Sequence, residues 1–218
     1  MTPGPASAVL FDLDGTLVDS APDLLGALDQ VLAERGLPAS DHERLRHHAS
    51  RGAAGILEAG LGASVDDRTR RAFLDHYGRN LWCRTRPFEG IEAMLEALAG
   101  RGIPMGVVTN KISRFADPVI AHAGWTEYFG CVIAGDRVDR PKPDPEGVLE
   151  ACRQLGVTPG RCLFVGDDRR DVIAGRAAGV VTLIAGWGYL PPGEDVTEWR
   201  ADRFVREPRE VVKLAESS

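Results

Sequence analysis

Short apolar segments bounded by Gly, Pro or Asp alternate with longer amphipathic segments along most of this chain. Short apolar runs between such breakers predict strands, and apolar residues spaced three and four apart predict helices. The predicted strands span residues 8–12, 105–109, 131–134, 162–165 and 181–185. The predicted helices span residues 92–100, 114–123, 146–155 and 171–178. This alternation predicts an α/β fold with a parallel sheet that helices cover on both faces.

Residues 17–87 depart from this alternation because they contain almost no strand-type segment. Ser20 and Asp23 fit a capping box at the start of a first helix, and Gly36 fits its C-cap. One face of that helix would carry Leu24, Leu25, Leu28, Val31 and Leu32. Further helical patterns lie around residues 41–49, 53–59 and 66–83. We therefore predict a helical domain, residues 17–87, inserted into an α/β domain formed by residues 1–16 and 88–218.

Composition narrows the class of protein. The 218 residues are 44% hydrophobic and 27% charged, which is typical of a globular chain with a real core. No apolar run approaches the roughly 18 residues that span a bilayer, and the N-terminal segment has no basic region typical of a secretory signal. A formal net charge of −6 is a poor match for a nucleic-acid binder. We expect a cytoplasmic monomer or weak homodimer without nucleic-acid or membrane partners.

The cysteines and histidines indicate no metal centre of their own. Cys83, Cys131, Cys152 and Cys162 form no CxxC pair, so we expect buried, reduced thiols. The five histidines have no zinc-binding spacing.

Two carboxylates directly follow the first predicted strand. Asp12 and Asp14 leave the strand on the same side because they are two residues apart. In open parallel sheets, ligands bind at the carboxyl ends of the strands. Two close carboxylates repel each other unless a cation lies between them or one is protonated. A simple turn stays open as an alternative, whereas a calcium loop would need a Gly and a Glu that are absent here.

Other polar residues follow later strands in the same way. The second predicted strand ends at Thr109, which Asn110 and Lys111 follow. The strand over residues 162–165 leads to Asp167, with Asp171 one helical turn further along. Lys142 lies between these segments in a proline-rich loop. An acid, a hydroxyl, an ammonium and a second acid therefore occur in chain order at or near successive strand ends.

This set resembles the four-motif signature of the haloacid dehalogenase-like hydrolase superfamily over nearly the whole chain. The matching residues are Asp12 with Asp14 and Thr16, then Thr109, then Lys142, then Asp167 with Asp168 and Asp171. The stretches VVTNK, RPKPDPEGVLEAC, FVGDDRRDVIAGRAAG and GWGYLPP are similar to the phosphoglycolate phosphatase family, and the GDDxRD, GRxAG and GYxxP patterns most resemble its branch acting on N-acetylmuramic acid 6-phosphate. The resemblance implies a Rossmann-like sheet of order 5-4-1-2-3 with a helical type-1 cap inserted after the first strand.

The resemblance also implies a reaction. Asp12 would attack phosphorus and form an aspartyl-phosphate. Asp14 would protonate the leaving oxygen and then deprotonate water. Mg²⁺ would be held by the Asp12 carboxylate, the Asp14 backbone carbonyl and the Asp167 carboxylate. Lys142 would stabilise negative charge in the transition state. The expected substrate is a small phosphate ester.

Further roles follow from the same resemblance. Thr109 and the Asn110 N–H would bind phosphoryl oxygens, and Lys111 would meet the substrate from the rim. Asp171 and Thr16 would support the site from behind. Arg51, in the expected cap loop, would pair with a substrate carboxylate. Two later residues, Trp187 and Tyr189, are expected to serve packing.

Four rival functions are weighed against this one. A dehalogenase lacks the second Asp, which is present here as Asp14. A phosphosugar mutase uses a cap His, where this chain has Leu24, and phosphonoacetaldehyde hydrolase uses a cap Lys, whereas the first lysine here is Lys111. A catalytically silent binder would have no reason to keep all four motifs. The substrate stays open between 2-phosphoglycolate and N-acetylmuramic acid 6-phosphate, both of which carry a carboxylate.

Overall fold

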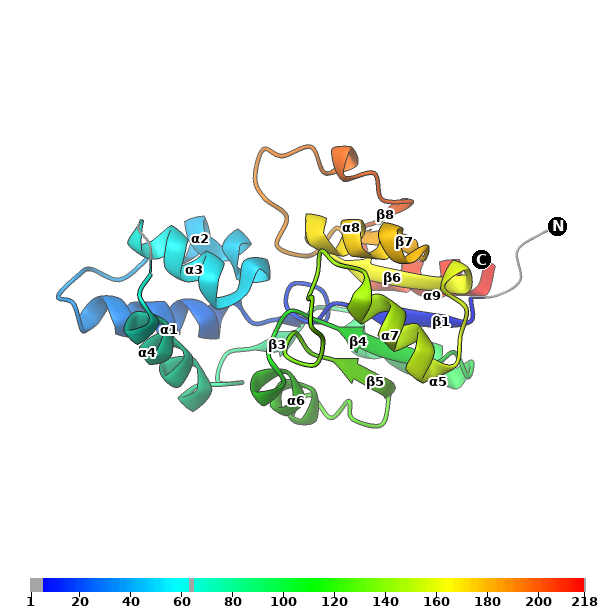
Figure 1. Ribbon diagram of the computed structural model, residues 1–218, viewed down its shortest axis with the longest axis horizontal. Coiled ribbons are helices and arrows are strands. Elements are labelled where there is room, and N and C mark those ends of the chain that lie inside the picture. The colour runs from blue at the N-terminus through cyan, green and yellow to red at the C-terminus, as the bar shows by residue number, and fades with distance from the viewer. Residues whose placement is uncertain (1–5, 63–64, 218) are drawn as a thin grey trace.

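A six-stranded parallel sheet forms the centre of the molecule in the computed structural model, which describes residues 6–62 and 65–217 (Figure 1). Its strands are β1 (Ala8–Phe11), β4 (Met105–Val108), β5 (Phe129–Ile133), β6 (Cys162–Gly166), β7 (Val181–Ala185) and β8 (Arg203–Val205). They lie in the order β5-β4-β1-β6-β7-β8, and every adjacent pair is parallel. The five strands expected from the sequence are present, with bounds that differ by at most two residues. Strand β8 was not predicted, because its segment is short, largely exposed and carries no apolar run.

Helices cover both faces of the sheet, as the alternating pattern predicts. On one face lie α5 (Ile91–Gly100), α6 (Ser113–His122) and α9 (Pro208–Ser217), whose apolar residues join one buried cluster. On the other face lie α7 (Glu146–Leu155) and α8 (Arg169–Ala178). Strand β1 is therefore buried from both sides, and its four residues are fully enclosed.

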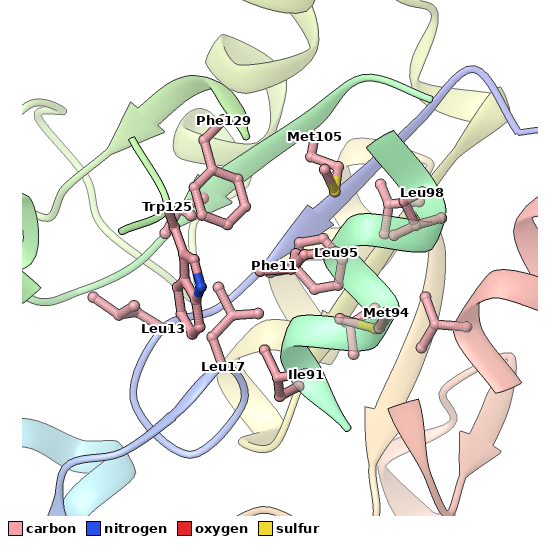
Figure 2. Close-up of a cluster of buried hydrophobic side chains, with 14 of the residues drawn as sticks. Phe11, Leu13, Leu17, Ile91, Met94, Leu95, Leu98, Met105, Trp125 and Phe129 are labelled. Atoms are coloured by element: carbon pink, nitrogen blue, oxygen red, sulfur yellow. The ribbon is translucent and has the colours of Figure 1, made fainter. Parts of the chain in front are cut away.

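The larger cluster holds the carboxyl end of β1 in place (Figure 2). The ring of Phe11 packs edge-on against Phe129 of β5, with the ring centroids 6.5 Å apart. Helix α5 contributes Ile91, Met94, Leu95 and Leu98, which share one helical face and are at most 1% exposed. Close packing of this kind gives Phe11 a single position, and with it the residue that follows.

A group of helices lies beyond the carboxyl ends of the strands, at the left of Figure 1. It consists of α1 (Ala21–Ala33), α2 (His42–Leu45), α3 (Gly52–Leu61), α4 (Asp67–Arg79) and a 3-10 helix, Arg46–Arg51. We call this group the helical insert. It has its own buried cluster, which includes all five leucine and valine residues predicted to share one face of the first helix. The insert leaves and re-enters the core through an antiparallel pair, β2 (Val18–Asp19) and β3 (Arg86–Pro87).

The predicted capping box at the start of α1 is wrong. The Ser20 side chain makes no cap hydrogen bond and instead donates to Asp14 Oδ1 at 2.5 Å. The Asp23 carboxylate accepts hydrogen bonds from the backbone N–H groups of Arg84 and Thr85. Ser20 and Asp23 thus bond to residues outside the first turn of α1 and not to the helix N-terminus that they were predicted to cap. Gly36 is not the C-cap itself, since α1 ends at Ala33 and Glu34 caps it.

The cysteines follow the expectation only in part. All four are free thiols, and Cys131, Cys152 and Cys162 are buried, but Cys83 is exposed. Cys83 follows α4 in the turn that leads back to β3, where no core surrounds it. Among the described residues, no helix combines the length and apolarity that crossing a membrane requires.

Candidate active site

Three neighbouring strands bring the predicted site residues together. Asp12 follows β1, Thr109 follows β4 and Asp167 follows β6, and β1 lies between the other two strands. All three strands are parallel, so these residues emerge at the same edge of the sheet. Their side chains are buried. The edge facing the helical insert is therefore rich in oxygen ligands.

Lys142 reaches this edge from the loop between β5 and α7. Its Nζ lies 2.8 Å from Asp12 Oδ1 and 2.7 Å from Asp171 Oδ1, and it donates a hydrogen bond to the Val108 carbonyl at 2.8 Å. Three acceptors thus face the three N–H groups of one ammonium. Burial alone would lower the pKa of Lys142, but the carboxylates of Asp12 and Asp171 raise it above its ordinary value. The lysine therefore carries a positive charge beside Asp12.

Three buried carboxylates form a compact cluster. One oxygen from each of Asp12, Asp167 and Asp171 lies within 4.8 Å of the others. Burial, and then the charges of Asp12 and Asp171, raises the pKa of Asp167 well above its ordinary value. Burial likewise raises the pKa of Asp171 to about 7, although Lys142 opposes this shift. One ammonium thus leaves negative charge uncompensated, and hard oxygen donors of this kind fit a divalent cation such as Mg²⁺.

Asp167 is held firmly by donors from three segments. Its Oδ1 accepts from Thr16 Oγ1 at 3.1 Å, and its Oδ2 accepts from Ser50 Oγ at 2.7 Å and from the Tyr189 N–H at 2.9 Å. Gly15, with φ of 85°, packs so closely that a Cβ there would collide with the Asp167 carboxylate. The loop after β1 therefore needs glycine at this position. Thr16 therefore contacts Asp167 directly, and its supporting role in the reaction stays a prediction.

Asp14 is also paired, and Lys111 lies elsewhere than expected. Lys111 Nζ is 2.9 Å from Asp14 Oδ1 and 3.0 Å from Oδ2. The Lys111 side chain is only 6% exposed, so it lies deeper than a rim residue. It nevertheless lines the cavity, so its contact with the substrate stays a prediction. Its ammonium also lies over the ring of Tyr77, 4.7 Å from the centroid. A sequence pattern shows that Lys111 follows a strand but not how deep its side chain lies.

Thr109 and Asn110 line the same cavity. Thr109 Oγ1 accepts from the backbone N–H of Lys111 at 3.1 Å. The Asn110 amide donates to the Lys142 carbonyl at 2.8 Å, which ties the lysine loop to the end of β4. Asn110 Oδ1 is buried and finds no partner within the described part of the chain.

A cavity of about 300 Å³ separates these residues from the helical insert. The catalytic candidates Asp12, Asp14 and Lys142 line it on the core side. Arg51 lines it from the insert, but its guanidinium pairs with Glu58 at 3.1 Å and is half exposed. The insert thus covers the carboxylates and leaves room for a ligand between the two.

Two residues join the insert to the core without having been singled out as site residues. Arg170, in the first turn of α8, donates to the Ser50 carbonyl at 2.7 Å and to Asp168 Oδ1 at 2.7 Å. The Tyr189 hydroxyl donates to Asp19 Oδ1 at 2.8 Å and accepts from the Ala21 N–H at 2.9 Å. Tyr189 was expected only to pack. The indole of Trp187 packs against the core cluster but also donates to the Thr16 carbonyl at 2.9 Å.

Most of the chain matches the model of one protein family. The family model described as haloacid dehalogenase-like hydrolase matches residues 6–179. The chain belongs to the haloacid dehalogenase-like hydrolases. This hydrolase is 42% identical over 211 residues to the N-acetylmuramic acid 6-phosphate phosphatase of Pseudomonas aeruginosa, covering 95% of this chain and 93% of that protein. It is 40% identical over 205 residues to the phosphoglycolate phosphatase of Xanthomonas campestris, covering 92% of each.

Solved structures agree with this assignment. A predicted phosphoglycolate phosphatase from Haemophilus somnus matches the hydrolase with a TM-score of 0.84 at 26% identity, over 96% of this chain and 97% of that one. A haloacid dehalogenase (HAD) family hydrolase from Deinococcus radiodurans, with bound phosphate and sodium, matches with a TM-score of 0.76 at 27% identity, over 99% of this chain and 97% of that one. The hydrolase is accordingly a phosphoric monoester hydrolase.

Proposed function

We propose that this hydrolase cleaves the phosphate monoester of a small carboxylated molecule through an aspartyl-phosphate on Asp12. One observation carries the proposal. Asp12 lies at the end of a fully buried strand with the Lys142 ammonium 2.8 Å away, and Asp14 faces the same cavity. A nucleophile, a cation and a second acid are therefore present where a phosphoryl group could enter.

In the first step an Asp12 oxygen attacks phosphorus while the bond from phosphorus to the ester oxygen breaks. Asp14 supplies the proton that the leaving oxygen takes up. Lys142 stabilises the charge that develops on the phosphoryl oxygens, because its ammonium is fixed in place before the reaction. Thr109 and the backbone N–H of Asn110 would bind two of those oxygens.

In the second step a water attacks the aspartyl-phosphate and Asp14 accepts its proton, which releases phosphate and restores Asp12. Lys111 donates to both carboxyl oxygens of Asp14 and so fixes the position of that group beside the cavity. Ser50 and Arg170 hold the insert over the cavity and so help to exclude bulk water.

We propose Mg²⁺ as the cofactor, held by the carboxylates of Asp12 and Asp167 and by the Asp14 backbone carbonyl. The uncompensated charge of the carboxylate cluster supports this choice. When bound, the ion would supply positive charge that reduces the repulsion between the Asp12 carboxylate and an anionic phosphoryl group. Asp171 would act through Lys142, its partner at 2.7 Å.

We further propose that residues 17–87 are a type-1 cap and that residues 1–16 and 88–218 are the catalytic domain. The separate hydrophobic cluster of the insert supports this division. We take the run β7-β6-β1-β4-β5 as the order 5-4-1-2-3 that the family implies, with β8 added at the edge. A cytoplasmic location is part of the proposal, supported by four thiols that are all free.

Two carboxylated esters are candidate substrates. 2-Phosphoglycolate is the substrate implied by the broader family, and N-acetylmuramic acid 6-phosphate is the substrate named for the Pseudomonas relative. The volume of the cavity favours the second candidate, since about 300 Å³ is the lower end of the range for pockets that enclose drug-sized ligands. A two-carbon acid would fill little of that space.

The decisive experiment measures release of phosphate from both esters and from p-nitrophenyl phosphate, with Mg²⁺ and after chelation. We expect hydrolysis that requires the metal and is abolished in Asp12→Asn, because that variant lacks the attacking oxygen. Full activity of Asp12→Asn, or full activity after chelation, would contradict the proposal.

A further inference from the structure

One stripe of helix α4 lines the cavity opposite the catalytic residues. Arg70, Phe73, Leu74 and Tyr77 all contribute to the cavity wall. Their spacing of three, one and three residues places them on a single face of the helix. The stripe is polar at both ends and apolar in the middle, as is suitable for an amphipathic ligand.

Tyr77 lies at the catalytic end of this stripe. It is 1% exposed, and although the Lys111 ammonium lies close enough to donate to its hydroxyl, the hydroxyl proton has no acceptor within the described part of the protein. Its ring is fixed by Phe115, at 5.1 Å between centroids, and by the Lys111 ammonium above it. Leaving a buried hydroxyl without a partner is costly, and a ligand oxygen or nitrogen in the cavity would remove that cost.

Arg70 lies at the other end of the stripe, where it lines the cavity and is exposed to solvent. Its guanidinium makes no ion pair or hydrogen bond with any residue that the structure describes, whereas Arg51 already pairs with Glu58. Seven residues separate Arg70 from Tyr77, which is about 10 Å along a helix axis. Side chains on a helix all tilt toward its N-terminus, so the two side chains tilt in the same direction and keep about this separation.

We propose that this stripe is a leaving-group subsite for an extended, amphipathic acid. Tyr77 hydrogen-bonds a polar group close to the phosphate, Phe73 and Leu74 contact the carbon skeleton, and Arg70 binds a carboxylate at the far end. This rests on the proposed phosphatase function and narrows its substrate class. In 2-phosphoglycolate the carboxylate is separated from the phosphate by one methylene, so that ester cannot span the stripe.

The test compares N-acetylmuramic acid 6-phosphate, a sugar phosphate with a lactyl carboxylate, with 2-phosphoglycolate. We expect the wild type to have a kcat/KM about a hundredfold higher for the larger ester, since it makes two more polar contacts. Tyr77→Phe should lower that preference about tenfold and Arg70→Gln about ten- to a hundredfold, through a higher KM for the larger ester at similar kcat. Arg70→Lys should restore part of the loss, because it keeps the charge without the planar fork.

Matched controls separate this effect from damage to the fold. Arg71→Gln removes the adjacent arginine of α4, which does not line the cavity, and Tyr128→Phe removes a hydroxyl outside it. Both should keep the wild-type preference. Equal losses on both esters, or an unchanged preference in Tyr77→Phe and Arg70→Gln, would overturn the subsite.

Binding measured without turnover distinguishes failure of the subsite from failure of the function. Calorimetry in the Asp12→Asn background should show weaker binding of N-acetylmuramic acid 6-phosphate when Tyr77→Phe or Arg70→Gln is added. Such weakening, together with a wild type that hydrolyses neither ester, would support the subsite and contradict the phosphatase. Hydrolysis with no dependence on Tyr77 or Arg70 would do the reverse.

Discussion

At the scale of single residues, Lys142 shows why this site needs an ammonium. The chain has 26 basic residues, of which only Lys111, Lys142 and Lys213 are lysines. Two of these three lie in the site, each against a buried aspartate. The Lys142 side chain is 4% exposed, and its three N–H groups face three acceptors arranged around one nitrogen. A planar guanidinium is larger and directs its donors differently.

We therefore predict that Lys142→Arg lowers kcat about 100- to 1,000-fold, the range that accompanies loss of one fixed electrostatic contact to a transition state. Steady-state kinetics on p-nitrophenyl phosphate measures this. Lys213→Arg, at an exposed position, is the control with the same chemical change. A near-normal rate in Lys142→Arg would mean that any positive charge suffices beside Asp12.

At the scale of elements, Tyr189 connects the sheet to the base of the insert. The residue follows β7, yet its hydroxyl contacts Asp19 at the end of β2 and the Ala21 N–H at the start of α1. Its backbone N–H donates to Asp167. The strand pair through which the insert leaves the core is thus tied to a proposed metal ligand by one side chain.

Tyr189→Phe should lower the free energy of unfolding by about 1–3 kcal/mol, because the Ala21 N–H and the Asp19 carboxylate lose a buried partner. Urea unfolding followed by circular dichroism measures the change, and its slope should stay as in the wild type. An unchanged midpoint would show that water replaces the hydroxyl without cost.

A second link within the insert predicts a pH dependence. Asp29 in α1 accepts from the N–H and the hydroxyl of Ser40 and lies 2.7 Å from His42. Burial alone would raise the pKa of Asp29, but these contacts together lower it below the ordinary value of 3.8. A carboxyl with a lowered pKa in the folded state stabilises the fold above pH 3.8, and this contribution is lost as pH falls through the folded pKa.

Asp29→Asn should therefore cost about 1 kcal/mol of unfolding free energy at pH 7, the value of one or two partly exposed hydrogen bonds. The difference from the wild type should shrink as pH falls below about 4, where the wild-type carboxyl is protonated as well. Urea unfolding at several pH values measures this difference. A constant difference from pH 7 to pH 3 would contradict it.

These links also mark how far the sequence alone could predict the structure. Local patterns predicted five sheet strands and the apolar face of α1, because periodicity depends on each segment itself. They failed for β8 and for the role of Ser20, since those depend on partners far along the chain. The same holds for the site. The sequence predicted that the residues at the strand ends lie near one another. It could not predict the buried position of Lys111, because that depends on how α4 packs over it.

At the scale of the whole molecule, the carboxylate cluster that is suited to hold a metal lowers the stability of the metal-free fold. Burial and two neighbouring charges raise the pKa of Asp167, so the stability of the fold falls as pH rises above the ordinary carboxyl pKa, where the unfolded chain gives up this proton more readily than the folded one. A bound cation would reverse this, because whatever binds only the folded state stabilises it. A site arranged to hold a metal should therefore be less stable than a neutral equivalent until the metal is present.

Asp167→Asn tests this balance. Without metal the variant should melt at a higher temperature than the wild type, because a neutral amide avoids the cost of burying a carboxyl beside two others, while Thr16, whose hydroxyl can also accept, still pairs with the amide. Mg²⁺ at about a hundred times its Kd should raise the wild-type Tm by roughly 5–10 °C, from about 2.7 kcal/mol of binding energy. The variant should lose both this rise and its activity.

The control is Asp75→Asn, on the exposed side of α4, which should keep both the Mg²⁺-dependent rise and the activity. Differential scanning calorimetry with and without Mg²⁺ measures all three proteins. A variant that melts below the wild type without metal, or one that keeps the Mg²⁺-dependent rise, would mean that Asp167 is not the residue through which stability and metal binding are opposed.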